Sequence, residues 1–246
     1  MRKHKYEPSK RYSDLVNSTP RDHLFEAFTG LFLDEHNDPD LEEVFSLLCQ
    51  IFDPECHASL LGDELDTLAK AVTNKNPQGM IEVLFSSGLL VGDKLQYDHP
   101  HNSLPHKVLT SGRGLPITLC VIAILISRRC GINLWGVGLP GHFVLGTNAS
   151  DQTEYFDPFN GGLPLTQDQC LAIASMSGGL TGDADDILQP TTTRAVVIRT
   201  LNNLTQSYRR RSDMVGLQAV VALRLVVPEL CRIDQKSTFA LLRELN

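Results

Sequence analysis

The chain has 246 residues, of which 42% are apolar and 21% are charged, and its formal net charge is −7 at neutral pH. This composition is typical of a globular protein and excludes a disordered chain. The net negative charge also argues against a general nucleic-acid-binding protein, because affinity for phosphates needs clustered lysine and arginine.

Cysteine usage and the apolar runs indicate where the protein resides. The six cysteines form no CxxC pair and no regular framework, and we interpret them as buried, reduced thiols of a cytoplasmic protein. They occur at positions 49, 56, 120, 130, 170 and 231. The N-terminal residues are charged where a signal peptide would be apolar, and the longest apolar run, 115–127, is too short to span a bilayer. The sequence therefore predicts a cytoplasmic protein without a membrane segment.

The N-terminal third divides into a tail and a helical region. Residues 1–20 are polar and contain two prolines, so we expect a disordered tail. Residues 21–90 follow a helical pattern, in which the apolar positions of the first helix recur every three or four residues. These positions are Leu24, Phe25, Phe28, Leu31 and Phe32. Further helices are predicted at 41–51, 60–72 and 80–90.

Residues 91–186 form the predicted core. Its first part, 91–112, contains three histidines and two prolines and is predicted mostly as loop. A helix then begins at Pro116 and ends before Gly131, because proline suits the first turn of a helix and glycine the position after its end. The residues between them are apolar almost all round, so this helix is predicted to be buried.

Three short segments rich in β-branched and aromatic residues follow, at 133–137, 142–146 and 153–156. Glycine, proline, asparagine and aspartate separate them, which is typical of strands joined by turns. We expect an antiparallel sheet packed on the buried helix, and hence an α+β fold. After the sheet, Thr166 offers the cap of a helix that runs to Ala174, followed by a loop.

Residues 187–246 are predicted as a C-terminal helical region, with helices at 193–211 and 213–227. Together these two helices resemble one helix-turn-helix repeat unit. A lone repeat cannot bury its own apolar faces, so we expect it to dock on the central domain. The same helices are the surface through which we predict a protein partner, and the sequence leaves the oligomeric state open.

The chemistry of the core depends on His142 and Asp157, which are fifteen residues apart. Two adjacent antiparallel strands can place residues at this separation side by side. A carboxylate that holds one imidazole nitrogen fixes the tautomer and leaves the other nitrogen to act as a base. A nucleophile at the start of the buried helix would be stabilised by the helix dipole and by free N–H groups. A nucleophile, a histidine base and an orienting aspartate placed in this way form the catalytic arrangement of papain-like cysteine enzymes.

Four motifs, in this order, resemble the SirB1 family of the transglutaminase-like superfamily. They are YDHPHNS at 97–103, RGLPITL at 113–119, GVGLPGHF at 136–143 and FDPFNGG at 156–162. The resemblance extends weakly to both flanks, where 199–229 looks like the start of the family's tetratricopeptide-like tail. It implies a papain-like core with helical flanks, and a His–Asp site rather than a particular reaction.

The nucleophile is the main departure from that family pattern. In catalytic transglutaminase-like proteins a cysteine opens the buried helix, and the corresponding position here is Pro116. Cys120 lies one turn deeper on nearly the same helix face, while Thr118, the nearest hydroxyl, lies on a different face. The usual nucleophile is therefore missing or displaced, and the candidates are Cys120, Thr118 or none.

Each candidate also has a structural interpretation. Cys120 fits an inert core thiol, and Thr118 fits a residue that satisfies backbone N–H groups at the helix start. His142 fits a hydrogen-bonded structural histidine, and Asp157, which precedes a proline, fits the first residue of a turn. Asn102 can order the loop before the helix or donate to an oxyanion.

The histidines at 99, 101 and 106 raise the question of a metal site. Their spacing differs from common zinc sites and no fourth ligand is evident, so we predict no metal and no cofactor. Glycine motifs for nucleotides are also absent from the sequence.

We therefore predict a transglutaminase-like domain that keeps His142 and Asp157 in a cleft against the helix start. The leading interpretation is a non-catalytic binding or regulatory module with a degenerate Cys-His-Asp site. The alternative is thiol-type acyl transfer or amide hydrolysis, with His142 as base, Asp157 as its orienter and Cys120 as nucleophile. Residue patterns alone leave open whether the protein is an enzyme.

Overall fold

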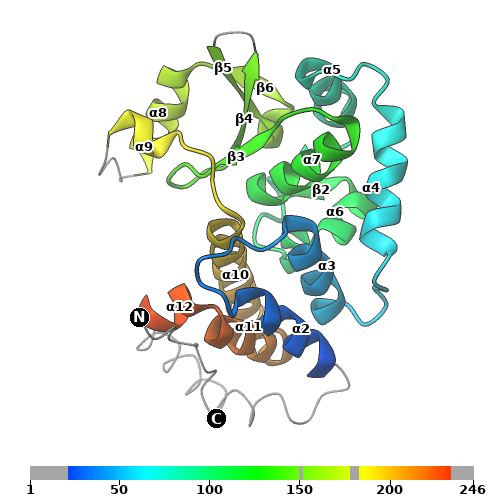
Figure 1. Ribbon diagram of the computed structural model, residues 1–246, viewed down its shortest axis with the longest axis vertical. Coiled ribbons are helices and arrows are strands. Elements are labelled where there is room, and N and C mark those ends of the chain that lie inside the picture. Colours follow the sequence, from blue (N-terminus) through cyan, green and yellow to red (C-terminus); the bar gives the residue numbers. More distant parts are fainter. Residues whose placement is uncertain (1–21, 150–151, 178–182, 234–246) are drawn as a thin grey trace. The chain divides into compact units, whose positions relative to one another are not determined.

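The computed structural model describes residues 22–149, 152–177 and 183–233 (Figure 1). It divides into two units, of which the first joins the segment up to Ala58 with the segment from Thr193 onward, and the second comprises Ser59–Thr192. The predicted tail lies outside the described residues. The predicted division into four regions at residues 20, 90 and 186 stays a prediction.

The first unit consists of helices. They are α2 (Asp22–Phe32), α3 (Leu41–Phe52), α10 (Thr193–Arg210), α11 (Met214–Val226) and α12 (Pro228–Ile233). The predicted apolar stripe of α2 is confirmed at four of its five positions, since Leu24, Phe25, Phe28 and Phe32 are buried and Leu31 is half-buried. The predicted C-terminal helix pair is confirmed as α10 and α11, which pack against each other.

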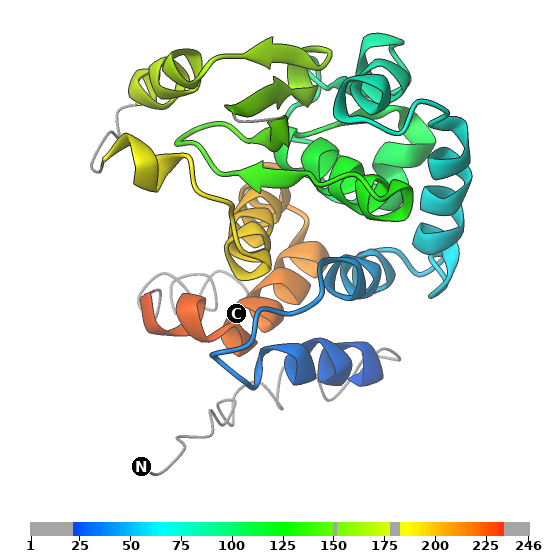
Figure 2. The ribbon, with the colours of Figure 1, turned by 45° about the horizontal axis from the view of Figure 1, so that its top comes forward.

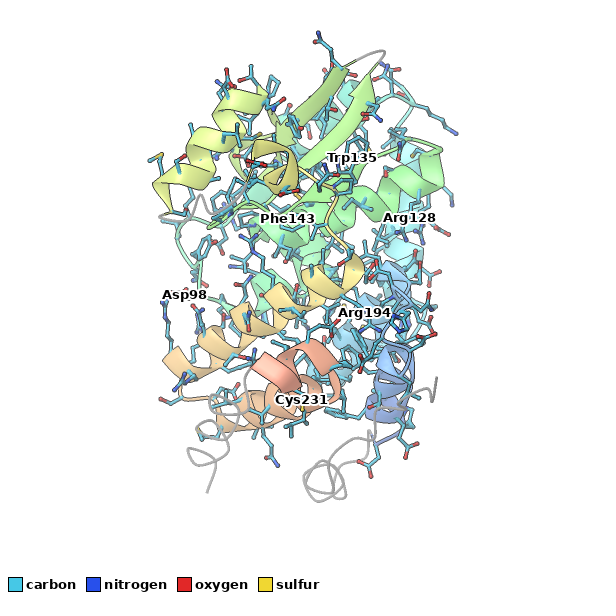
Figure 3. All side chains as sticks on the ribbon, turned by 60° about the vertical axis from the view of Figure 1, so that its left-hand side comes forward. Asp98, Arg128, Trp135, Phe143, Arg194 and Cys231 are labelled. Atoms are coloured by element: carbon cyan, nitrogen blue, oxygen red, sulfur yellow. The ribbon has the colours of Figure 1, made fainter. Side chains whose placement is uncertain are left out.

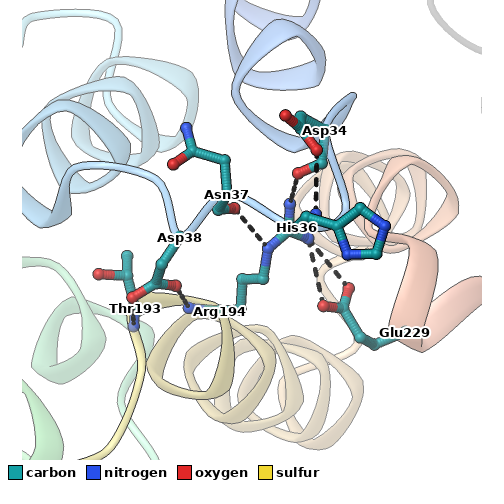
Figure 4. A network of polar contacts seen from close by, with 7 residues as sticks. All are labelled: Asp34, His36, Asn37, Asp38, Thr193, Arg194 and Glu229. Carbon is teal, nitrogen blue, oxygen red and sulfur yellow. Dashed lines mark hydrogen bonds and ion pairs between the residues drawn. The ribbon is translucent and has the colours of Figure 1, made fainter.

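A buried arginine ties the start of α10 to the loop after α2 and to α12 (Figure 4). Arg194 donates from Nε to the carbonyl oxygen of Asn37 at 2.9 Å and forms an ion pair with Glu229 at 3.2 Å. The carboxylate of Asp38 accepts the backbone N–H groups of Thr193 and Arg194 at 2.8 and 2.9 Å. Asp38 therefore caps α10 from a position 155 residues earlier in the chain, where no local sequence signal marks it as a cap.

The second unit begins with α4 (Leu60–Ala71), α5 (Pro77–Ile81) and the π-helical turn η1 (Glu82–Ser86). The predicted bounds of the helix at 80–90 are wrong at both ends. Pro77 begins α5 rather than breaking the chain, because proline suits the first turn and Asn76 caps it by accepting the N–H of Gly79. Gly88, with φ of +80°, follows the turn after η1.

The expectation that residues 91–112 are mostly loop is also wrong. This segment holds β1 (Val91–Gly92), the 3₁₀ helix η2 (Pro100–Ser103) and α6 (Pro105–Ser111), and β1 pairs in parallel with β2 (Arg113–Gly114). Both prolines lie at the first position of their helices, where the missing N–H costs nothing. Proline was therefore a start signal here rather than a loop signal.

The core of the second unit is α7 (Pro116–Cys130) against a four-stranded antiparallel sheet (Figure 2). The predicted helix is confirmed in both bounds, and Gly131 ends it with φ of +71°. The strands, in the order β3-β4-β5-β6, are β3 (Trp135–Val137), β4 (Val144–Ala149), β5 (Gln152–Asp157) and β6 (Leu163–Leu165). The α+β fold class is thus confirmed, with β6 as an unpredicted fourth strand.

Two helices follow the sheet. Thr166 caps α8 (Gln167–Met176) as predicted, through a capping box with Gln169. The helix continues two residues beyond the predicted end at Ala174, and α9 (Ala184–Ile187) lies where only loop was expected. None of the described helices combines the length and the apolar character needed to cross a membrane.

Candidate functional site

His142 lies in the turn that joins β3 to β4. Gly141 has a φ of +73°, and the backbone N–H of His142 donates to the carbonyl oxygen of Leu139 at 3.1 Å. The strand begins only at Val144, so the expectation that a strand presents His142 is wrong by two residues. The reason is local, because the left-handed glycine closes a turn immediately before the histidine.

Asp157 is the last residue of β5 and also the first residue of a turn. Its Oδ1 accepts the backbone N–H groups of Phe159 at 3.1 Å and Asn160 at 3.3 Å, and its Oδ2 accepts the side-chain amide of Asn160 at 2.8 Å. These bonds cap the short 3₁₀ helix η3 (Pro158–Asn160). The structural interpretation of Asp157 as a turn residue is therefore confirmed, alongside its contact with the histidine.

The structure brings His142 and Asp157 together. The Nε2 atom of His142 lies 2.9 Å from Oδ2 of Asp157, and the side chains are 14% and 3% exposed. Because a carboxylate only accepts, Nε2 carries the proton and Nδ1 is the nitrogen that can accept one. Within the described part of the chain, Nδ1 makes no hydrogen bond. The ring of Phe159 meets the imidazole edge-on, with centroids 6.1 Å apart.

The environment keeps Asp157 ionised. Burial by itself would raise the pKa of this carboxyl, but the hydrogen bond and charge of His142, together with the bonds from Asn160, outweigh burial and lower the pKa. The charge of Asp157 also acts on Cys170, which lies on α8. Burial first, and then the charge of Asp157, raise the pKa of Cys170 to about 11, so this cysteine remains a neutral thiol at physiological pH.

Cys120 is completely buried on α7. Its Sγ lies 3.7 Å from the carbonyl oxygen of Phe143, a residue labelled in Figure 3, and donates to it. The thiol is thus directed at the main chain beside His142. Thr118 is also buried, and its hydroxyl has no hydrogen-bond partner among the described residues, so the interpretation in which it satisfies N–H groups of the helix start is wrong.

The loop before α7 is ordered by Asn102. Its side-chain amide donates to the Asp93 carboxylate at 3.1 Å and to the carbonyl oxygen of Gln96 at 2.7 Å. Burial by itself would raise the pKa of Asp93, but hydrogen bonds from the Gln96 N–H, Asn102 and the Leu95 N–H, with the charge of Arg113, lower it. The loop-ordering interpretation of Asn102 is confirmed by these contacts.

The described residues contain no group of three or more histidine, cysteine, aspartate or glutamate side chains that could hold a metal ion. The rings of His99 and His101 meet edge-on with centroids 4.3 Å apart. The backbone N–H of His101 donates to Nδ1 of His99, which gives that imidazole a local structural role at the start of η2.

Two residues beside the site were not assigned a role from the sequence. Asn160 donates to Asp157, and Lys94 donates from Nζ to Oδ1 of Asn160 at 3.0 Å. The Lys94 ammonium also lies 5.9 Å from the centroid of the Phe159 ring. Asn160 could have been found from its place in the FDPFN motif, but no local signal marks Lys94, which is 66 residues away.

Two clefts of the second unit lie close to the residues described above. A cleft of about 390 Å³ is adjacent to the site and is lined by Val91, Gly92, Lys94, Leu95, Arg113, Phe159, Asn160 and Gly161. A larger cleft of about 830 Å³ lies between the α5–η1 segment and strands β5 and β6. Neither His142 nor Asp157 lines either cleft, but the smaller one is lined by Phe159 and Asn160, which contact the His–Asp pair.

Comparison with known proteins identifies the family. A family model described as the transglutaminase-like superfamily matches residues 60–202, which is more than half of the chain. The chain belongs to the transglutaminase-like superfamily. The matched segment contains the His142–Asp157 pair, α7 and the whole sheet.

Its relatives include proteins from bacteria and animals. A UPF0162 protein of Xylella fastidiosa strain Temecula1 is 32% identical over 207 residues, covering 80% of this chain and 70% of that protein. A UPF0162 protein of Pseudomonas aeruginosa is 31% identical over 108 residues, covering 44% of this chain and 38% of that protein. F-box only protein 21 of Mus musculus is 26% identical over 147 residues, covering 55% of this chain and 23% of that protein. No solved structure matches the chain at the level of similarity that these relatives reach.

Proposed function

We propose that this member of the superfamily is a SirB1-type protein that acts in the cytoplasm as a non-catalytic binding or regulatory module. Its Cys-His-Asp site is degenerate, with His142 and Asp157 retained and the nucleophile lost. The observation that carries the proposal is the state of Cys120, which is completely buried with its thiol on a main-chain oxygen. A catalytic cysteine needs a thiolate that a substrate can reach, and burial among apolar residues favours the neutral thiol.

The remaining groups around the pair support the same conclusion. Burial and the charge of Asp157 raise the pKa of Cys170 to about 11, which disfavours the thiolate at this second cysteine as well. The adjacent cleft contains charged, amide and aromatic side chains, including Lys94, Arg113 and Phe159. Such a lining suits recognition of a ligand by hydrogen bonds and ring contacts without covalent chemistry.

We further propose that a protein partner binds through the C-terminal helices α10 and α11, which would form a tetratricopeptide-like unit. Two apolar side chains at the start of α11 support this surface, since Met214 is 43% and Val215 81% exposed. Contiguous exposed apolar patches mark protein-binding surfaces, and these two neighbouring side chains would contribute to such a patch.

The second candidate is thiol-type acyl transfer or amide hydrolysis, favoured by the 2.9 Å contact between His142 and Asp157. In this mechanism Cys120 gives its proton to Nδ1 of His142 and the thiolate attacks the acyl carbon of an amide. The C–N bond breaks as His142 returns the proton to the leaving amine, and water or a second amine then takes the acyl group from the thioester. This mechanism requires α7 to expose a thiol that is now buried.

Cysteine labelling separates the two candidates. Folded wild-type protein and His142→Ala are treated with iodoacetamide from pH 5 to pH 9, and each of the six cysteines is followed by mass spectrometry. The proposal predicts slow labelling of Cys120 that is unchanged in the variant, while the half-buried Cys231 serves as the internal reference. Selective labelling of Cys120 at low pH that disappears in His142→Ala would overturn the proposal in favour of the acyl-transfer mechanism.

A further inference from the structure

Among the described residues, four hydrogen bonds reach the Asp157 carboxylate. Oδ1 accepts the backbone N–H groups of Phe159 and Asn160, and Oδ2 accepts Nε2 of His142 and Nδ2 of Asn160. These four bonds reach the full acceptor capacity of about four lone-pair sites for an ionised carboxylate. Asn160 supplies two of them, one from its main chain and one from its side chain. It therefore contributes more bonds to this carboxylate than Phe159 or His142, which supply one each.

Lys94 determines which way the amide of Asn160 faces. An ammonium group only donates, so the Nζ atom of Lys94, at 3.0 Å, must face the carbonyl oxygen of the amide. Asp157 only accepts, so the NH₂ group must face the carboxylate, at 2.8 Å. The two neighbours thus require the same orientation, and the opposite one would leave both contacts repulsive. The Phe159 ring below Lys94 is the same ring that meets His142 edge-on.

We propose that Asn160 and Lys94 are positioning residues for His142, and that they determine the chemistry of its ligand. Together they hold the Asp157 carboxylate in the orientation in which it accepts a hydrogen bond from the Nε2–H group of His142. Nδ1 then remains an acceptor, so the ligand must offer a hydrogen-bond donor at this point, such as an amide N–H or a hydroxyl group. This inference rests on the proposed binding function, because it specifies what the His142 site recognises.

The test measures the tautomer of His142 in the ligand-free protein. Protein labelled with ¹⁵N-histidine is studied by NMR at a pH where the ring is neutral, and the two nitrogen shifts give the ratio of the Nε2–H to the Nδ1–H form. The variants are Asn160→Ala, Lys94→Met and Lys94→Arg, with Lys75→Met as a control at an exposed lysine of the same unit. Wild type should show the Nε2–H form in excess.

Asn160→Ala and Lys94→Met should both shift the ratio toward an even mixture, while Lys94→Arg, which keeps a charged donor, and Lys75→Met should retain the wild-type ratio. A structural role alone would change the thermal midpoint without moving the tautomer. Lys94 is exposed, so its variants keep the test valid even where Asn160→Ala fails to fold. An unchanged ratio in Lys94→Met would overturn the positioning role.

Asp157→Ala, which removes the acceptor of the Nε2 proton, distinguishes failure of this inference from failure of the site itself. If Asp157→Ala changes the tautomer ratio while Lys94→Met and Asn160→Ala do not, the pair exists and only the positioning role is wrong. An unchanged ratio in Asp157→Ala would show that the His–Asp contact does not govern His142, which overturns this inference and removes the pair from the proposed binding site. The tautomer is measured in the protein without a ligand, so the result does not depend on identifying one.

Discussion

The network around Arg194 allows the stability of the C-terminal helix pair to be predicted in detail. We expect Arg194→Met to destabilise the protein by about 3 kcal/mol, because a methionine keeps the apolar stem but forms none of the charged hydrogen bonds. Two of those bonds end on main-chain oxygens, of Asn37 at 2.9 Å and of Asp34 at 2.5 Å. Bonds to a charged group contribute about 1.5 to 3 kcal/mol each, and the cost of burying the guanidinium places these two at the low end.

The other contacts of Arg194 add little to this figure. The Glu229 carboxylate is 34% exposed, so its ion pair is worth less than about 1 kcal/mol. The guanidinium also lies 5.2 Å from the centroid of the Phe32 ring, a contact that the apolar methionine side chain partly retains.

Urea unfolding followed by circular dichroism measures the change in unfolding free energy. Arg194→Lys is the matched control, since it keeps the charge but lacks the planar fork that reaches several acceptors at once, and we expect it to lose about half as much, roughly 1.5 kcal/mol. A change below about 1 kcal/mol for Arg194→Met would refute the assignment of this network as a main connection in its unit, because exposed substitutions alone reach about 0.5 kcal/mol.

Three further predictions concern the core unit. Hydrogen bonds from His142 and Asn160 outweigh burial and lower the pKa of Asp157, so its ionised form stabilises the fold at neutral pH. The difference in unfolding free energy between wild type and Asp157→Asn should therefore shrink as the pH falls below the ordinary range of an aspartate. Burial and the charge of Asp157 raise the pKa of Cys170 to about 11, so its alkylation in the folded protein should stay negligible up to pH 9, and rapid labelling at pH 8 would contradict this. Gly162→Ala should lower the thermal midpoint more than Gly161→Ala: both glycines have φ near +75°, at a strain cost of about 1 kcal/mol, but only a Cβ at Gly162 would collide with the Ile81 side chain.

The sequence predicted the elements whose signals are local. Pro116 and Gly131 bound α7 in both the prediction and the structure, because a proline at the first turn and a left-handed glycine after the last act within a few residues. The helices α10 and α11 followed from their apolar periodicity. The His142–Asp157 contact was also predictable, since the spacing of two consecutive strands brings both residues to the same end of a hairpin.

Elements stabilised by distant partners were missed. The two-residue strand β1 exists because it pairs with β2, more than 20 residues later, and no periodicity can develop over so short a segment. The strand β6 contains Pro164, which argues against a strand in sequence, but β6 is an edge strand where a missing N–H is tolerated. Both were decided by pairing rather than by local preference.

The candidate site shows the same division between local and tertiary information. Its residue types, the histidine, the carboxylate and the absence of a cysteine at the helix start, were readable from the chain. Only the tertiary structure placed Cys120 on the Phe143 carbonyl and brought Lys94 to Asn160 across 66 residues. A hydrogen bond over that separation depends on the path of the whole intervening chain, so no pattern of neighbouring residues can encode it.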